Sequence, residues 1–136
     1  MITQKEIMLP PFAKGFHNID HYIVEALSPL PAAGMVNIFI QHTSAGLMIN
    51  ENADPDVMVD LTTLLERTAP ENDPEYTHTI EGPDDMPSHF KSAVLGHSLT
   101  VPITGGKLNL GTWQGIFLCE FRNRPRSRKL VVTMYM

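Results

Sequence analysis

The spacing of apolar residues divides the N-terminal third of the chain into strand-like and helix-like segments. β-Branched and aromatic residues in partial alternation predict strands over residues 3–9 and 35–41. Between them, apolar residues recur at helical spacing over residues 19–27, after Asn18 as a possible N-cap and before Pro29. This third of the chain is therefore expected to fold as strand, helix, strand.

A second helix has a clear start in the sequence. Asp54 is suited to the N-cap, Pro55 to the first helical position, and Asp56 places a carboxylate in the first turn, where the helix dipole favours it. The apolar residues that follow at helical spacing predict one buried stripe, formed by Val57, Met58, Leu61, Leu64 and Leu65.

The second half of the chain begins with a long polar segment. Residues 69–85 are rich in Pro, Asn, Asp and Glu, and loops of this length in a small domain are usually functional or mobile. A short helix is expected over about 87–95. The remaining elements are three strands, expected as one antiparallel set joined at Gly105-Gly106 and Asn123-Arg-Pro, over about 97–104, 112–122 and 128–135.

The order of these elements predicts the fold class. The series β, α, β, α, α, β, β, β contains too few strand–helix–strand alternations for a doubly wound parallel sheet. No repeat or break in composition divides the 136 residues. We therefore expect one compact α+β domain over residues 1–136, with about three helices and a largely antiparallel sheet or sandwich.

Composition narrows the class of protein. With 43% hydrophobic and 18% charged residues, the chain is typical of soluble globular proteins, and no apolar run approaches the ~18 residues of a membrane-spanning helix. No secretory signal is visible, so a cytoplasmic location is expected. The single cysteine, Cys119, lies in an apolar run and is expected to be buried in a strand.

Charge is distributed unevenly. The first 106 residues carry four basic and fourteen acidic side chains, a net charge of −10, whereas the last thirty carry six basic residues against Glu120 alone, a net charge of +5. A basic segment of this kind suits an anionic ligand, although a solvated hairpin remains an alternative. Nucleic acid is disfavoured because no aromatic residues are interleaved with the basic ones.

Two polar segments follow the second strand. His42, Thr43 and Ser44 lie in a loop at the strand end, where His42 could act in chemistry and the hydroxyls could bind phosphate, although the segment is no P-loop. Asn50 and Asn52 precede the second helix and could orient a ligand. A structural histidine and ordinary turn chemistry are the alternatives.

The densest cluster of ionisable residues lies between positions 78 and 89. It comprises His78, Glu81, Asp84, Asp85 and His89. Imidazole and carboxylate groups together suit zinc, manganese or other transition ions, and an oxygen-only subset suits magnesium. The alternative is a solvated acidic loop in which Asp85 caps the next helix. His17, His21 and His97 have no clustered partners and are weaker candidates.

The only tryptophan lies among four glycines in residues 105–115. Trp113 and Gln114 could contact a ligand, but a tightly packed hairpin is the favoured interpretation of this segment.

Taken together, these motifs closely resemble one known family over nearly the whole chain. His42-Thr-Ser-Ala, Asn50-Glu-Asn-Ala-Asp-Pro-Asp, His78-x2-Glu-Gly-Pro-Asp-Asp-Met-Pro-x-His89 and Gly111-Thr-Trp-Gln-Gly occur in the order found in the YjbQ-like family, also called secondary thiamine-phosphate synthases. The resemblance implies a compact α+β fold, a homotrimer with sites near subunit boundaries, and a weak or side activity as a thiamine-phosphate synthase.

The resemblance, taken with the chemistry of the residues and of the implied reaction, also assigns roles to residues. The catalytic candidates are His42, His78, His89 and Asp85. The metal-binding candidates are His42, His78, His89, Glu81 and Asp84, with zinc, magnesium or manganese as the ion. The substrate-binding candidates are Ser44, Asn50, Asn52, Trp113, Gln114, Arg122 and Arg126.

In the implied reaction, the ring nitrogen of a thiazole phosphate attacks the methylene carbon of hydroxymethylpyrimidine diphosphate, and pyrophosphate leaves. The partner is then a small phosphorylated metabolite, with neither nucleic acid nor a membrane involved. Two alternatives stay open: a metal-dependent hydrolase or transferase acting on another phosphorylated metabolite, and a non-catalytic trimeric protein that binds a metal or metabolite.

Overall fold

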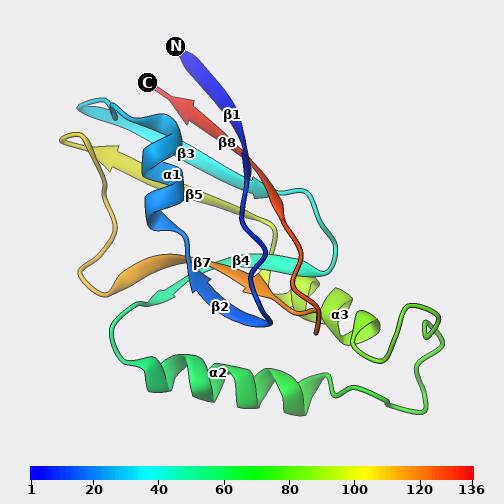
Figure 1. Cartoon of the computed structure of the whole chain (residues 1–136). Coiled ribbons are helices and arrows are strands. Elements are labelled where there is room, and N and C mark those ends of the chain that lie inside the picture. Colours follow the sequence, from blue (N-terminus) through cyan, green and yellow to red (C-terminus); the bar gives the residue numbers. More distant parts are fainter.

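A computed structural model describes residues 1–136, which form eight strands and three helices (Figure 1). The helices are α1 (Asp20–Leu27), α2 (Pro55–Thr68) and α3 (Asp85–Leu95). The strands are β1 (Ile2–Met8), β2 (Gly15–Asn18), β3 (Ala33–Ile40), β4 (Ala45–Glu51), β5 (Ser98–Thr104), β6 (Lys107–Leu108), β7 (Gln114–Glu120) and β8 (Lys129–Tyr135). The expected α+β class is confirmed.

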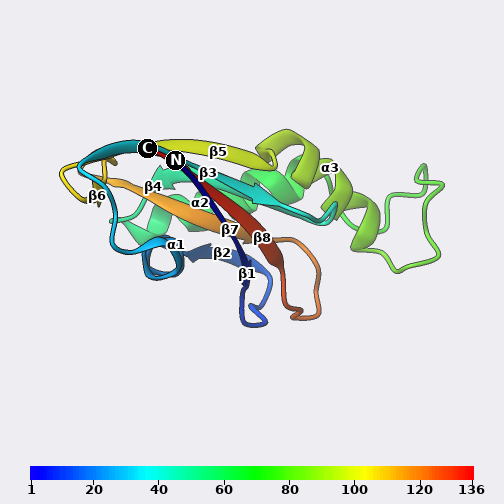
Figure 2. The same ribbon diagram turned by 90° about the horizontal axis from the view of Figure 1, so that it is seen from above.

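The strands form two separate antiparallel sheets. The larger sheet has the order β1-β8-β3-β5-β6, and the smaller has the order β2-β7-β4. The main core lies between them, because it takes Ile38 and Val132 from the larger sheet and Leu118 from the smaller, with Ile23 of α1. Seen from above, the two sheets overlie one another (Figure 2). One core therefore joins both sheets and α1.

The smaller sheet is covered on both faces. Leu47 and Leu118 face the main core, while Met48, Phe117 and Cys119 belong to a second apolar cluster on the opposite face. Every residue of β7 after Gln114 is consequently buried, and Cys119 is buried as expected. This double burial replaces the apolar–polar alternation of a half-exposed strand with a continuous apolar run.

The helix α2 packs less tightly than its sequence predicts. It lies beneath the smaller sheet (Figure 1), and Met58, Leu61 and Leu65 contact the second cluster, but no residue of α2 is buried and Leu64 is 55% exposed. The prediction of a buried stripe is wrong because α2 contacts a single sheet face. Its start is as expected, since Asp54 caps the helix by accepting from the Asp56 amide.

The predicted strand set is wrong in its pairing. The Gly105-Gly106 turn leads into the short β6 and not into β7, and the last three long strands are not neighbours: β5 pairs with β3, β7 with β2 and β4, and β8 with β1 and β3. The strands β2 and β4 were not expected at all. Asn18 is the last residue of β2, and α1 begins at Asp20 without a side-chain cap.

Two further features concern the helices and the chain ends. The helix α3 begins at Asp85, two residues before the expected start, and residues 69–84 contain no helix or strand, as expected. The two chain ends lie side by side because β1 pairs with β8 (Figure 1). None of the three helices is long and apolar enough to cross a bilayer.

Candidate functional site

Three connections meet at one end of the smaller sheet. They are the β3–β4 loop, the start of α3 and the connection from β7 to β8. Ser92 of α3 donates its hydroxyl proton to the Ala45 carbonyl over 2.8 Å, and His89 Nδ1 lies 2.8 Å from the Thr43 carbonyl oxygen. These bonds fix the face of α3 that carries Asp85 and His89 against the start of β4.

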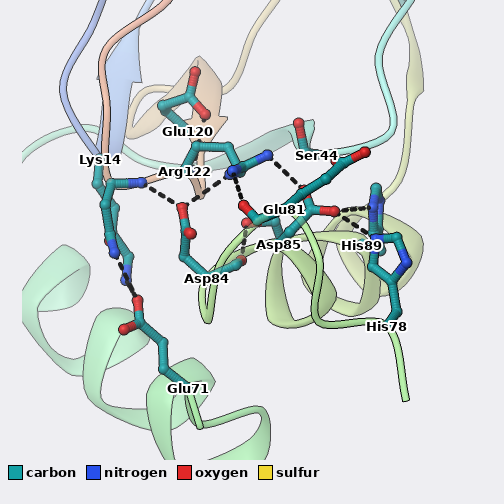
Figure 3. A network of polar contacts seen from close by, with 12 residues as sticks. Lys14, Ser44, Glu71, His78, Glu81, Asp84, Asp85, His89, Glu120 and Arg122 are labelled. Carbon is teal, nitrogen blue, oxygen red and sulfur yellow. Dashed lines mark hydrogen bonds and ion pairs between the residues drawn. The ribbon is translucent and has the colours of Figure 1, made fainter. Parts of the chain in front are cut away.

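Asp85 is the centre of the site (Figure 3). Its side chain is 1% exposed, and its Oδ2 lies 2.6 Å from His78 Nε2 and 2.9 Å from His89 Nε2. Its Oδ1 accepts from Arg122 Nη1 over 2.6 Å. Asp85 and His89 are four residues apart on α3, so one helical turn places them together, while His78 reaches them from the polar loop.

The hydrogen bonds of His89 restrict its protonation. The Thr43 carbonyl can only accept, so His89 Nδ1 carries a proton. His89 Nε2 then faces the Asp85 carboxylate, which also only accepts. This second contact is favourable in two cases: Nε2 carries a proton and His89 is an imidazolium, or a cation lies between Nε2 and the carboxylate.

Asp85 itself is held ionised. Burial would raise the pKa of this carboxyl, but hydrogen bonds from His78 and His89 and the charge of Arg122 outweigh burial and lower it. The ligand atoms of His78, Asp85 and His89 all lie within 4.8 Å of one another. Two imidazoles and one carboxylate in this arrangement can hold a divalent cation or share protons.

Arg122 orients the carboxylates. Its Nε donates to Asp84 Oδ2 over 2.9 Å, Nη1 to Asp85, and Nη2 to the Glu81 carbonyl over 2.9 Å. Asp84 also accepts from the Asn123 amide over 2.9 Å. Burial would raise the pKa of Asp84, yet these bonds lower it. All three ends of the guanidinium are therefore occupied by the protein.

A buried ion pair between Arg128 and Glu120 connects the same loops. Arg128 donates Nε to Glu120 Oε1 over 2.7 Å and Nη2 to Glu120 Oε2 over 2.6 Å. Arg128 Nη2 also donates to the Ser44 carbonyl, and Glu120 accepts from the Arg122 amide. The pair thus ties the ends of β7 and of the β3–β4 loop to the start of β8.

His42 lies beside this site with a different role. Its Nε2 accepts from the Lys129 amide over 2.8 Å, so the lone pair of that nitrogen is already used. Burial and the charge of Arg128 lower the pKa of His42, which keeps it neutral. His42 lines a cavity of about 450 Å³ together with His89 and His97. His97 had no clustered partner in the sequence, and only the pairing of β5 with β3 brings it here.

Comparison with known proteins identifies the family of this chain. The family model for UPF0047 protein YjbQ-like matches residues 5–136. The chain is 43% identical to UPF0047 protein YjbQ of Escherichia coli O157:H7 and 46% identical to that of Salmonella typhimurium, in each case over 98% of both chains. It belongs to the YjbQ-like UPF0047 family.

Solved structures agree with this assignment. The conserved hypothetical protein TT1486 from Thermus thermophilus superposes with a TM-score of 0.84 at 38% identity, covering 94% of this chain and 97% of that one. A YjbQ/UPF0047 protein from Clostridium acetobutylicum also gives 0.84 at 38% identity, over 96% and 98%. The resemblance to the YjbQ-like family that was seen in the sequence is confirmed.

The UPF0047 fold separates the predicted site residues into two groups. Asn50, Asn52, Trp113 and Gln114 lie at the opposite end of the β4–β7 pair from Ser44 and Arg122. Eight residues of extended chain separate Ser44 from Asn52, which amounts to roughly 25 Å. Within one chain, these two groups therefore cannot contact the same small ligand.

Within the cluster, the Glu81 and Asp84 side chains do not contact the two histidines as Asp85 does. Glu81 is exposed and contributes its carbonyl, and Asp84 is bonded to Arg122. Arg126 lines a polar cleft of about 370 Å³ with Arg122 and Arg124, and its buried Nε has no hydrogen-bond partner. Glu81 and Asp84 also line this cleft, and Arg124 and Arg126 are its two arginines that form no ion pair.

Proposed function

We propose that His78, Asp85 and His89 bind a divalent cation and that this UPF0047 chain acts there on a small phosphorylated metabolite. The observation that carries the proposal is the environment of His89, whose Nδ1 donates to a backbone carbonyl while Nε2 faces a carboxylate at 2.9 Å. Metal-binding histidines typically donate their second ring nitrogen in this way.

The donor set favours a transition ion. Two imidazole nitrogens and one carboxylate oxygen suit zinc or manganese better than magnesium, which prefers oxygen ligands. Three protein ligands leave coordination positions open, as in catalytic zinc sites. A bound cation of this kind supplies positive charge that neutralises phosphate oxygens.

The polar cleft supplies the residues for the phosphate group. Arg124 and Arg126 line it, and the buried Arg126 Nε lacks a protein acceptor. A phosphate oxygen would provide that acceptor in a charge-assisted hydrogen bond. Arg122, which is fully engaged with Asp84, Asp85 and Glu81, positions the carboxylates and leaves phosphate binding to Arg126 and Arg124.

Among reactions, we favour the thiamine-phosphate synthase reaction that the sequence resemblance implies, as a weak or side activity. Arg124 and Arg126 would hold the diphosphate as pyrophosphate leaves. The cavity beside His42 and His89 has room for a heterocycle, and His42 stays neutral there. Hydrolysis of another phosphorylated metabolite, or its binding without reaction, uses the same residues and is separated by the assay below.

We further propose a homotrimer in which neighbouring copies complete the site. The outer face of the larger sheet carries Met35, Phe39 and Tyr135, which are 49%, 39% and 43% exposed. They point away from the core because they alternate with core residues along their strands. Burying this face would remove apolar surface from water. A second copy could also bring its Trp113 end to the His89 end of the first. The number of copies comes from the sequence resemblance.

The decisive experiment measures metal and product on the same preparations. We expect a stoichiometric ion by elemental analysis in the wild-type protein and in H21Q, a control that alters an exposed histidine of α1. We expect its loss in H78Q, D85N and H89Q, each with a native circular dichroism spectrum. No ion after reconstitution with zinc, manganese or magnesium would overturn the cation proposal.

The same proteins are then incubated with hydroxymethylpyrimidine diphosphate and thiazole phosphate. Thiamine phosphate formed by wild type and H21Q but not by D85N supports the synthase reaction. Inorganic phosphate released without joining of the two substrates favours the hydrolase. Binding of the phosphorylated compounds without any product favours the non-catalytic protein.

A further inference from the structure

A second cavity, with mainly apolar walls, lies on the other side of α3 from the histidine site. It measures about 270 Å³ and lies between α2, β2, α3 and the end of β7. Its lining residues are Lys14, Gly15, Phe16, Thr62, Leu65, Glu66, Lys91, Glu120 and Phe121. No residue of this cavity belongs to the proposed cation site or to the arginine cleft.

Lys91 is the unusual residue of this cavity. Its side chain is 2% exposed, and its Nζ has one hydrogen-bond partner, Glu66 Oε1 at 3.0 Å. Its other contact is the ring of Phe121, whose centroid lies 5.8 Å away. An ammonium carries three donors, and burying one is costly unless they are satisfied. The remaining donors of Lys91 therefore require acceptors from inside the cavity.

The charges around the cavity favour an anion as that acceptor. Lys14 Nζ lies 2.8 Å from the same Glu66 oxygen, so two ammonium groups share one carboxylate. The charge of Glu120 is already compensated by Arg128. Glu71 is 3.7 Å from Lys14 at the rim and is also bonded to Asn123. Lys91 therefore shares its one acidic partner, Glu66, with Lys14.

The walls restrict the rest of the ligand. Phe16, Leu65 and Phe121 are the apolar residues of the lining. Their side chains suit a flat or branched apolar body, and the volume is below that of typical drug-sized pockets. A carboxylate offers two oxygens to the ammonium groups, and one negative charge is enough to balance Lys91.

We propose that this cavity is a binding site for a small monocarboxylate with an apolar body, whose carboxylate is held by Lys91 and Lys14. Glu66 shares both lysines and therefore competes with the ligand for them. The site is independent of the proposed function, since it uses none of the residues of the histidine cluster.

The test uses benzoate, phenylacetate and isovalerate as probes, with benzyl alcohol and benzylamine as neutral and cationic controls. We expect at least one carboxylate to shift the backbone amide resonances of Phe16, Glu66 and Phe121 in the folded protein at millimolar concentration. Neither control should do so. Failure of all three carboxylates to produce these shifts would overturn the proposal.

Variants test which residues hold the carboxylate. We expect K91M to weaken binding at least tenfold, and the exposed β1 variant K5M to leave it unchanged. E66Q should strengthen binding about threefold or more, because it removes the competing carboxylate. A purely structural Lys91–Glu66 pair predicts no gain in E66Q, so that variant decides the question if K91M does not fold. Unchanged binding in K91M would refute the site.

Discussion

Arg122 has the role of a positioning residue at the candidate site. It donates to Asp84, to Asp85 and to the Glu81 carbonyl, and so joins the polar loop, the first turn of α3 and the end of β7. Neither lysine nor an amide reproduces this fork of donors. We therefore expect Arg122 to influence cation binding by holding Asp85 in its orientation.

We expect R122Q to bind zinc or manganese roughly 10 to 100 times more weakly than wild type, the range typical of residues that orient metal ligands. Competition with a chelating dye measures this affinity. R124Q, which alters an exposed arginine of the same segment, serves as the control and should keep its metal affinity. Equal affinity in R122Q and wild type would refute the positioning role.

The environment of His42 predicts how the stability of the protein depends on pH. Burial lowers the pKa of His42 in the folded protein below the usual 6.5. At pH values between the folded pKa and 6.5, the unfolded chain therefore binds more protons than the folded protein does. Stability that depends on His42 is thus full above about pH 6.5 and lost as the pH falls through this window. Urea unfolding at pH 7.5 and 5.5 should show a smaller loss for H42Q than for wild type.

Nuclear magnetic resonance provides an independent check of His42. Because Nε2 accepts from the Lys129 amide, the neutral ring should carry its proton on Nδ1 and should titrate below 6.5. A ring protonated on Nε2 at pH 7.5 would contradict the structure.

The sequence predicts His78 and His89 in one site, but it assigns Glu81 and Asp84 to the metal and Asp85 to catalysis, whereas in the structure Asp85 contacts both histidines. His78 and His89 stand out because they are close in the chain. The spacing of Asp85 and His89 by four residues is a usable signal, but a helix expected to start at Pro87 instead of Asp85 conceals it. Lys91 gives no signal, because an isolated lysine in an amphipathic helix is typical of an exposed position.

At the scale of elements, the ends of β4, β7 and β8 depend on one ion pair. Arg128 and Glu120 are 2% and 0% exposed and share two hydrogen bonds. Removing one partner of a buried pair leaves the other charge uncompensated, whereas replacing both by apolar residues can be nearly neutral.

We expect R128M to lower the free energy of unfolding by about 3–5 kcal/mol, as for other broken buried pairs. The double variant R128M/E120L should recover a large part of that loss. Urea unfolding at pH 7 measures both. A double variant as unstable as R128M alone would show that the hydrogen bonds to Ser44 and to the Arg122 amide matter more than the charges.

Helices and strands were predictable where a local sequence pattern determines them. They were not predictable where packing against distant parts of the chain determines them. The start of α2 follows from Asp54, Pro55 and Asp56 in the sequence. The strand β4 was missed because Ala45–Ile49 is a short apolar run, and burial on both faces removes the alternation that signals a strand. The exposure of α2 could not be predicted either, because it depends on how many neighbouring elements pack against the helix.

At the scale of the whole molecule, the class was predictable and the strand order was not. The count of helices and strands indicates α+β, whereas the insertion of β8 between β1 and β3 depends on contacts between distant parts of the chain. The separation of Trp113 from His89 follows from the antiparallel pairing of β4 with β7 in the smaller sheet.

Assembly gives the prediction that belongs to this scale. We expect wild type to sediment at three times the mass of the 15.2 kDa chain, and F39E to dissociate because it places a charge on the outer face of the larger sheet. T63K alters an exposed position of α2 and should remain trimeric. A monomeric wild type, or a trimeric F39E, would contradict the proposed interface.

The position of β8 between β1 and β3 also determines when the larger sheet can form during synthesis. Each of its two neighbours, β1 and β3, precedes it in the chain, so both leave the ribosome with unpaired edges. Long-range pairing of this kind slows folding and leaves strand edges open to other chains. The smaller sheet is complete once β7 has emerged, so it and α2 can fold first and hold the nascent chain until β8 closes the larger sheet.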